Sequence, residues 1–443
     1  MSIHEAYPIH QLSLLQLGIY LLMNAFFIIF YTRRFKQEGV VTLDTFFITM
    51  YLYIPIIFML PFSYSELNAL ISTGEYHYLY TPYIDNAFYI CSFGLAFFSA
   101  GAALAKRWPL SLPGYNFSQS AFHNVIITRV GVITIAASAL FITSIMFFLG
   151  FELGNARGFA MQNASLRPLY NLFHILTPFS ALCCLTYGYK KSSTFFYVIG
   201  TLITLLGLVS GTRAASIGVA ISFTIMLGII TRYRNILIVG CIILFLCTSA
   251  IYIGGFRSGI YDLRKVMMLP TLILYGNNFS DLRDFAWTLS GWDGVYLQGR
   301  TYLAGAISFI PSSLSDYRST WNWASFSLRS SGLGSISEHA GLRTTVFGEA
   351  FFNFGLPGVA LIGLMLGVII TRLTYIIRNN INRFGPRKSI VTVFGAITYI
   401  ELMLSLVNTS GFFGFYITLG IIFFACIVKQ AILPLRTNTC TSH

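Results

Sequence analysis

The stretch TVFGEAFFNFGLPGVALIGLMLGVIIT, from Thr345 to Thr371, contains one charged side chain, Glu349. An α-helix needs about 20 mostly apolar residues to cross a hydrocarbon core of about 30 Å. Only a helix satisfies all of its own backbone hydrogen bonds within a single segment in lipid. The stretch therefore predicts a membrane-spanning helix with an acidic residue near its first turn.

Similar apolar runs recur along the whole chain. With 56% hydrophobic and 10% charged residues, the composition excludes an ordinary water-soluble globule. We therefore predict an all-α polytopic membrane protein with about eleven transmembrane helices. The ten further spans are Leu14–Tyr31, Phe46–Leu60, Ile84–Ala105, Val130–Leu149, Tyr170–Tyr187, Phe195–Val209, Ala214–Ile230, Ile236–Ile253, Ile390–Val407 and Phe412–Val428.

The charged residues predict the orientation of these spans. Most of the 28 basic residues fall in short connections on one side, which the positive-inside rule assigns to the cytoplasm. Among the 15 acids, only Glu38 and Asp44 lie near that side. We therefore expect the amino terminus outside and the carboxyl terminus inside. The net charge of +13 is thus a topological signal, and nothing in the sequence favours nucleic-acid binding.

One outer loop is much longer than the others. The sequence divides into helices 1–8 over residues 1–255, a large external loop with short helices over 256–344, and helices 9–11 with a cytoplasmic tail over 345–443. Long loops of this kind usually carry function. The apolar run Tyr302–Pro311 is too short to span and is expected to lie at the interface or dip into the bundle.

Arginines mark the outer helix starts. Arg167, Arg213 and Arg343 each precede or begin a predicted span that starts at the outer face, with Arg213 fixed in a tight turn. A cation there opposes the helix dipole, whereas a bound anion would reverse that effect. These arginines therefore either contact lipid headgroups or form a phosphate site with Arg157 and Arg300.

The other arginines of the large loop are expected on its surface, as are two of its acids. These residues are Arg257, Arg264, Arg283, Arg318, Arg329, Asp281 and Asp284.

Three further side chains are candidates for proton transfer from a sugar hydroxyl. Glu349 can serve as a base or can form a structural salt bridge to an arginine. His339 and Glu338 can serve as base or acceptor ligand, or can be an exposed loop pair. The outer segments contain no HExxH, P-loop, GxSxG or DxD pattern, so no metal or cofactor is required.

Aromatic side chains are concentrated in the same loop. Their flat apolar faces suit stacking on sugar rings, although interfacial aromatic belts give a similar enrichment. The tryptophans are Trp287, Trp292, Trp321 and Trp323.

Three segments carry a resemblance to a known family. They are SGTRAA (Ser210–Ala215), QGRTYLAGAISFIP (Gln298–Pro311) and TTVFGEAFFNFGLPG (Thr344–Gly358). With its topology, the chain resembles the bacterial oligosaccharide repeat-unit polymerases of the Wzy type, which build O-antigen and related surface polysaccharides. The resemblance implies an all-helical, metal-independent fold like that of the lipid-carrier (GT-C type) glycosyltransferases.

The same resemblance implies a reaction and its partners. A growing glycan would pass from undecaprenyl diphosphate to the terminal hydroxyl of a new lipid-linked repeat unit, at the periplasmic face of the cytoplasmic membrane. Arg213 and Arg300 would lie at the diphosphate and Glu349 near the mouth of the site. Membrane lipid and a chain-length regulator are the further partners implied. An O-antigen ligase of the same fold, with His339 in its loop, and a lipid-linked oligosaccharide flippase remain alternatives.

Overall fold

The computed structural model describes residues 13–39, 41–65, 77–108, 111–151, 166–209, 213–232, 269–276, 279–310, 314–333, 341–409 and 412–437. Every regular element within these ranges is a helix. The chain forms two compact units, which are described separately. The first comprises residues 1–111, 267–374 and 400–413, and the second comprises 112–266, 375–399 and 414–443.

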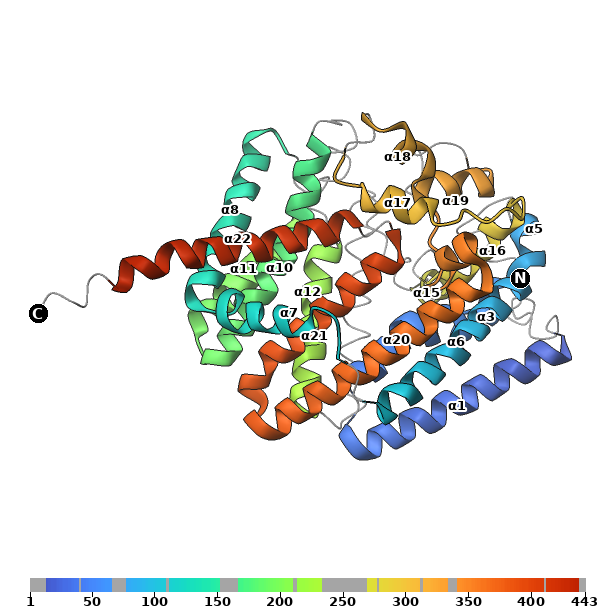
Figure 1. Cartoon of the computed structure of the whole chain (residues 1–443), viewed down its shortest axis with the longest axis horizontal. Coiled ribbons are helices and arrows are strands. Elements are labelled where there is room, and N and C mark those ends of the chain that lie inside the picture. Colours follow the sequence, from blue (N-terminus) through green and yellow to red (C-terminus); the bar gives the residue numbers. More distant parts are fainter. Residues whose placement is uncertain are drawn as a thin grey trace, which may run out of the picture. The chain divides into compact units, whose positions relative to one another are not determined.

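The first unit contains the helices that start the chain and the short helices of the large loop (Figure 1). Its opening elements are α1 (Leu14–Glu38), α2 (Leu43–Phe47), the π-helix η3 (Ile48–Phe58), α3 (Leu60–Ser63), α5 (His77–Tyr80), the 3-10 helix η6 (Thr81–Tyr83) and α6 (Ile84–Arg107). Its loop helices are α15 (Leu269–Leu274), α16 (Asp281–Ser290), α17 (Arg300–Ala306), α18 (Asp316–Trp321) and α19 (Trp323–Ser331).

The second unit contains the middle of the chain, and three helices contribute residues to both units. The second unit holds α7 (Tyr115–Ala121), the π-helix η7 (Phe122–Ile126), α8 (Arg129–Phe148), α10 (Arg167–Lys191), α11 (Thr194–Val209) and α12 (Arg213–Thr231). These three are α20 (Gly348–Phe384), α21 (Pro386–Val407) and α22 (Phe412–Thr437).

Six of the described helical segments are long and apolar enough to cross a membrane. They are Leu14–Glu38, Tyr78–Arg107, Arg129–Phe148, Pro168–Lys191, Gly348–Phe384 and Pro386–Val407. Four of the other predicted spans fall on the shorter apolar helices Leu43–Phe58, Thr194–Gly207, Gly218–Thr231 and Phe412–Phe424. The remaining one, Ile236–Ile253, lies outside the described residues.

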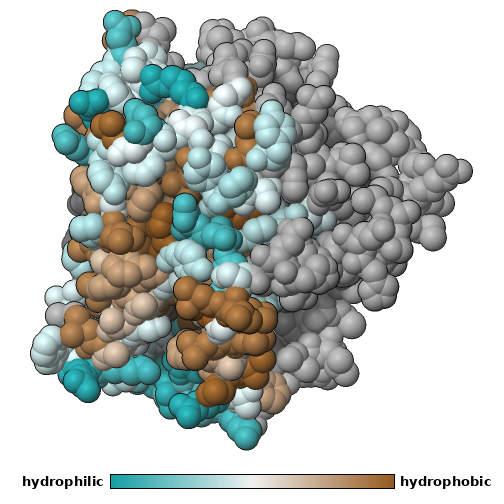
Figure 2. All heavy atoms as spheres, turned by 90° about the vertical axis from the view of Figure 1, so that its right-hand side faces the viewer, coloured by the Kyte–Doolittle hydropathy of each residue, from teal (hydrophilic) through white to brown (hydrophobic). Residues whose placement is uncertain are grey.

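The outer surface of the first unit is apolar where α1 lies. Leu14, Leu22 and Ile28 of α1 are more than half exposed, whereas only Gln16 and Phe27 of this helix are buried. Figure 2 shows hydrophobic residues gathered in the lower half of this face, with hydrophilic residues above and below them. Such a surface suits contact with lipid rather than with water.

Glycines let α6 and α20 approach closely. A Cβ added at Gly101 would lie 2.2 Å from the Leu364 carbonyl oxygen, and one at Gly367 would lie 2.1 Å from the Phe98 carbonyl oxygen. Gly363 meets the Gly94 carbonyl in the same way, at 2.5 Å. Backbone contact through small residues is a common means of packing helices in membranes. This contact holds the middle of α20 against α6.

Gly367→Ala should therefore destabilise the protein by about 1–3 kcal/mol, because the new methyl group has no space. The matched control is Gly18→Ala in α1, where a Cβ meets nothing within 4 Å. That change should be neutral or slightly stabilising, because alanine has the higher helix propensity. Thermal unfolding of both purified variants in detergent measures the difference, and equal Tm values would contradict the close packing.

Candidate functional site

Glu349 lies at the centre of a buried polar network in the first unit. Its side chain is 2% exposed, and it is the second residue of α20. The hydroxyl groups of Thr301 and Thr409 each donate to Oε1 at 2.6 Å, and the Thr409 backbone N–H donates to Oε2 at 2.8 Å. No arginine pairs with Glu349 among the residues that the structure describes. The carboxylate thus joins α17, the start of α20 and the residues after α21.

Asn353 extends this network by one helical turn. Its Nδ2 donates to the Thr301 hydroxyl at 2.8 Å and to the Glu349 carbonyl at 2.9 Å. Because the Thr301 oxygen accepts from Asn353, its single proton points at Glu349. The direction of each hydrogen bond at Thr301 is therefore fixed.

A break in α20 follows directly after Asn353. Gly355 has φ +66° and ψ −155°, a backbone conformation that glycine adopts without a steric penalty. Pro357 has no N–H to donate to the Asn353 carbonyl, which would be its helical acceptor. That carbonyl instead accepts from Gln298 N at 3.0 Å, and the Phe352 carbonyl accepts from Leu297 N at 2.9 Å. The FGLPG sequence therefore docks the segment before Arg300 onto α20.

Arg300 is the first residue of α17 and is exposed. Its guanidinium carbon lies 4.4 Å from the centroid of the Trp321 ring, and that of Arg329 lies 5.7 Å from the same ring. Arg329 also donates to the Thr320 carbonyl at 2.8 Å. Within the described ranges, no carboxylate forms an ion pair with either arginine. Two cations against one aromatic ring form a site that suits an anion.

Comparisons with protein-family models, with curated proteins and with solved structures find no match. The function of the site is therefore inferred from its geometry. A guanidinium presents paired N–H donors that match phosphate oxygens, and its π-face stacks on an aromatic ring without using those donors. Arg300 can therefore bind a phosphate while Trp321 fixes its position.

Arg343 lies in a different polar group, together with residues of α16. Its Nη2 donates to the Ser280 hydroxyl at 3.2 Å, and that hydroxyl donates to Asp284 at 3.0 Å. Asp284 also forms a 3.0 Å ion pair with Arg283, and these two residues are only 5% and 3% exposed. The expectation that Arg283 and Asp284 are solvated loop charges is therefore wrong. The reason is that α16 packs against several neighbouring helices, which cover almost all of its side chains.

The four loop tryptophans separate into two pairs. Trp287 and Trp323 are 4% and 6% exposed, and their indole N–H groups donate to the carbonyls of Ser331 and Leu342. These two rings are part of the packed core of the loop helices, so they present no face to a glycan. Trp292 and Trp321 are only partly buried and can contact a ligand.

Other predicted site residues lie in the second unit or outside the described residues. Arg167 and Arg213 are the first residues of α10 and α12, as the sequence predicts, and both belong to the second unit. Arg157, Glu338 and His339 lie outside the described residues. The residues that the structure brings together are therefore Arg300 with Trp321, and Glu349 with threonines that the sequence did not single out.

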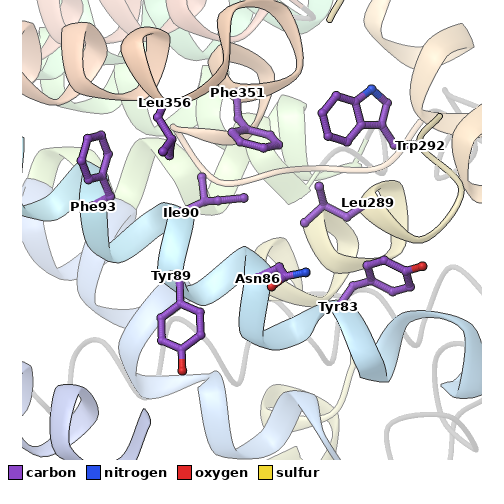
Figure 3. A pocket seen from close by; sticks show the side chains of 9 residues that line it. All are labelled: Tyr83, Asn86, Tyr89, Ile90, Phe93, Leu289, Trp292, Phe351 and Leu356. Carbon is purple, nitrogen blue, oxygen red and sulfur yellow. The ribbon is translucent and has the colours of Figure 1, made fainter. Parts of the chain in front are cut away.

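A cavity of about 510 Å³ lies beside the break in α20 (Figure 3). Trp292, Phe351 and Leu356 line one part of it, and Asn86 and Ile90 of α6 line another. The residues of α6 were not recognised as site residues, although their spacing places them on one helical face.

Glu349→Gln should lower the free energy of unfolding by about 1–3 kcal/mol. The two carboxylate oxygens accept from three donors, and in glutamine an NH₂ group, which is itself a donor, takes the place of one of these oxygens. Thr301→Val should have a similar effect, and the double variant should be less destabilised than the sum of the two changes, since both act on the Thr301–Glu349 hydrogen bond. Thr320→Val, at an exposed threonine, is the control. Tm in detergent reports all four, and fully additive effects would contradict the network.

Asp281→Asn should change the pH dependence of stability. Burial raises the pKa of Asp281 above its ordinary value of 3.8, and the nearby Arg343 opposes part of that rise. The stabilising contribution of this carboxyl is therefore complete below about pH 3.8 and is lost as pH rises through the raised pKa. The stability of the variant relative to the parent should be greater at pH 7 than at pH 4. Tm measured across this range, with the exposed Asp316→Asn as control, checks the sign, and parallel curves would contradict it.

Proposed function

We propose that this chain is a membrane glycosyltransferase that polymerises undecaprenyl-diphosphate-linked oligosaccharide repeat units into a surface polysaccharide such as O-antigen. The observation that supports the proposal best is Arg300, which is held against Trp321 at a fixed helix start and has no carboxylate partner among the described residues. This combination suits a diphosphate next to a sugar. The resemblance of QGRTYLAGAISFIP and TTVFGEAFFNFGLPG to this family supports the same conclusion.

The proposed arrangement places the site at the periplasmic face of a bacterial cytoplasmic membrane. Eleven spans, with the amino terminus outside and the carboxyl terminus inside, put the loop helices on the outer side. The fold would then be of the metal-independent GT-C type. The outer ends of the spans would supply Arg167 and Arg213. The outer loop between the fourth and fifth spans would supply Arg157, and the large loop would supply Arg300 and Arg343.

The reaction is an inverting transfer. The acceptor hydroxyl oxygen attacks the anomeric carbon of the donor glycan, a new glycosidic bond forms, and the bond from that carbon to the diphosphate oxygen breaks. The hydroxyl proton passes to His339 or to a phosphate oxygen. Arginines stabilise the charge that develops on the departing diphosphate, which is where electrostatic catalysis has its largest effect.

Glu349 has a positioning role in this proposal. Both of its carboxylate oxygens already accept hydrogen bonds from threonines, and its side chain is buried. It therefore fixes Thr301, and through Thr301 the adjacent Arg300, instead of meeting the substrate. This differs from the base role that the sequence allowed.

Arg300→Ala should reduce glycan extension by about 100- to 1000-fold, as expected when one group that stabilises the transition state is removed. Arg300→Lys should recover only part of the activity, because lysine lacks the planar pair of donors. The matched control is Arg383→Ala, since Arg383 also stacks on an exposed aromatic ring, that of Phe384, at 5.1 Å. The assay supplies lipid-linked repeat units to the purified chain and measures products of two or more units.

The same assay separates the alternatives. Transfer to lipid A core would favour the ligase, and a folded preparation that forms no glycosidic bond would favour the flippase. Normal extension by Arg300→Ala would remove Arg300 from the proposed diphosphate site. Arg213→Ala tests the contribution of the second unit, and the same loss of extension is expected.

A further inference from the structure

The short helix α17, which begins with Arg300, is attached to the turn between α21 and α22. The Tyr302 hydroxyl donates to the carbonyl of Val407, the last residue of α21, at 3.2 Å. A Cβ added at Gly305 would lie 2.7 Å from the Phe412 ring and 2.8 Å from the Thr409 Cβ. All of these residues belong to the first unit. The helix therefore packs directly on this turn.

This attachment relates α17 to the membrane. Pro386–Val407 is one of the segments that are long and apolar enough to cross a membrane. Its 22 residues extend about 33 Å, close to the thickness of a hydrocarbon core of about 30 Å. The last residue of such a helix lies where the hydrocarbon meets the headgroups, and tyrosine is typical of that level. The arrangement thus places α17 at the depth of lipid phosphates.

Two exposed apolar side chains flank the first turn of α17, where Arg300 lies. Leu303 follows Arg300 by three residues, so the two side chains are neighbours on the helix surface, and Leu303 is 54% exposed. The Phe354 ring stacks on the Tyr302 ring at 5.8 Å, and a Cβ added at Gly299 would lie 3.3 Å from the same ring. Phe354 is nevertheless 49% exposed. The exposed guanidinium therefore has apolar surface on the adjoining residues.

The break in α20 holds Phe354 in this position. The carbonyl of Asn353 accepts from the backbone N–H of Gln298, so the residues next to Phe354 and next to Gly299 are bonded to each other. The N–H of Leu303 donates to the Gly299 carbonyl at 3.0 Å. A surface that is already ordered loses little conformational freedom when a ligand binds to it.

A cation beside apolar surface at this depth matches a lipid with a phosphate head. In a polyprenyl diphosphate the first isoprene unit is bonded directly to a phosphate oxygen. A phosphate at Arg300 therefore brings that isoprene unit to the side chains within about one helical turn, which is about 5.4 Å. Leu303 and Phe354 can cover it there, and burial of apolar carbon stabilises the complex.

We infer that Leu303 and Phe354 bind the first isoprene units of a polyprenyl diphosphate whose phosphates contact Arg300. The inference rests on the proposed function and deepens it by assigning a subsite for the lipid carrier of the donor. The chain then continues from α17 into the bilayer. Such a site selects lipid-linked diphosphates over soluble ones, because a soluble diphosphate offers the same charge without the isoprenoid.

A binding experiment tests this without requiring catalysis. The full chain is placed in phosphatidylcholine nanodiscs with radiolabelled farnesyl diphosphate, and empty nanodiscs correct for partitioning into lipid. Leu303→Ala and Phe354→Ala should each weaken farnesyl diphosphate binding by about fivefold, because each removes apolar contact area. Leu22→Ala is the matched control, since Leu22 is a 72% exposed leucine of α1, and it should leave the binding unchanged.

Competition by inorganic pyrophosphate separates the isoprenoid contact from the phosphate contact. Leu303→Ala should leave the inhibition constant of pyrophosphate unchanged, whereas Arg300→Ala should weaken both ligands by at least ~10-fold. Unchanged farnesyl diphosphate binding in Leu303→Ala and Phe354→Ala would show that this surface contacts bulk lipid only, and would overturn the inference. Equal weakening of pyrophosphate would overturn it too, because the two residues would then only position Arg300.

The position of the chain has its own measurement. A farnesyl diphosphate with a diazirine on its first isoprene unit should label α17 in the wild-type protein, and excess pyrophosphate should prevent the labelling. Labelling confined to other helices would contradict the subsite. Leu303→Ala tests the inference even if Phe354→Ala does not fold, because Leu303 is exposed and alanine has a high helix propensity.

The extension assay separates this inference from the proposed function. If the protein shows the expected binding pattern but joins no repeat units, the carrier subsite stands and the polymerase proposal fails. If wild-type protein extends glycans, and Leu303→Ala does so with an unchanged KM for donor, the polymerase stands and the inferred subsite fails.

Discussion

The hydrogen bonds to Glu349 constrain the whole of the candidate site. A carboxylate that is 2% exposed and has no cation beside it in the described chain needs several donors, since burying an ionised group without partners is very costly. Two threonine hydroxyls and one backbone amide meet this need. Each hydrogen bond to a charged group contributes about 1.5–3 kcal/mol. The donors come from separate helical segments, so the same bonds that satisfy the acid also align α17, α20 and the end of α21.

The break in α20 adds a second constraint on the position of Arg300. In an unbroken helix the carbonyls of Phe352 and Asn353 would accept from residues four positions later, but Gly355 and Pro357 prevent this. The segment leading to Arg300 takes those two acceptors. One local defect therefore positions the arginine and also opens the space that Leu356 lines. A regular helix would have neither feature.

The sequence predicted the helical segments well because apolar length depends only on local composition. It also placed Arg167 and Arg213 at helix starts, as found in α10 and α12. It did not predict which side chains meet, because the partners of Glu349 are 48 and 60 residues away along the chain. The sequence also did not distinguish Trp287 from Trp321. Trp287 is buried in the core, whereas the ring of Trp321 packs against the guanidinium of Arg300. The burial of the Arg283–Asp284 ion pair could not be predicted either, because it depends on which helices cover α16.

The distribution of the acids explains why the first unit retains a cationic surface. Glu349 is satisfied by hydroxyl groups, and Asp284 is paired with Arg283 inside the loop helices, so neither carboxylate reaches Arg300 or Arg329. These two guanidinium groups both lie against Trp321, so an anion bound at this ring would meet two cations. The net charge of the loop would not reveal this, because its acids and arginines are similar in number. What makes the site suited to a phosphate is that no described acid forms an ion pair with Arg300 or Arg329.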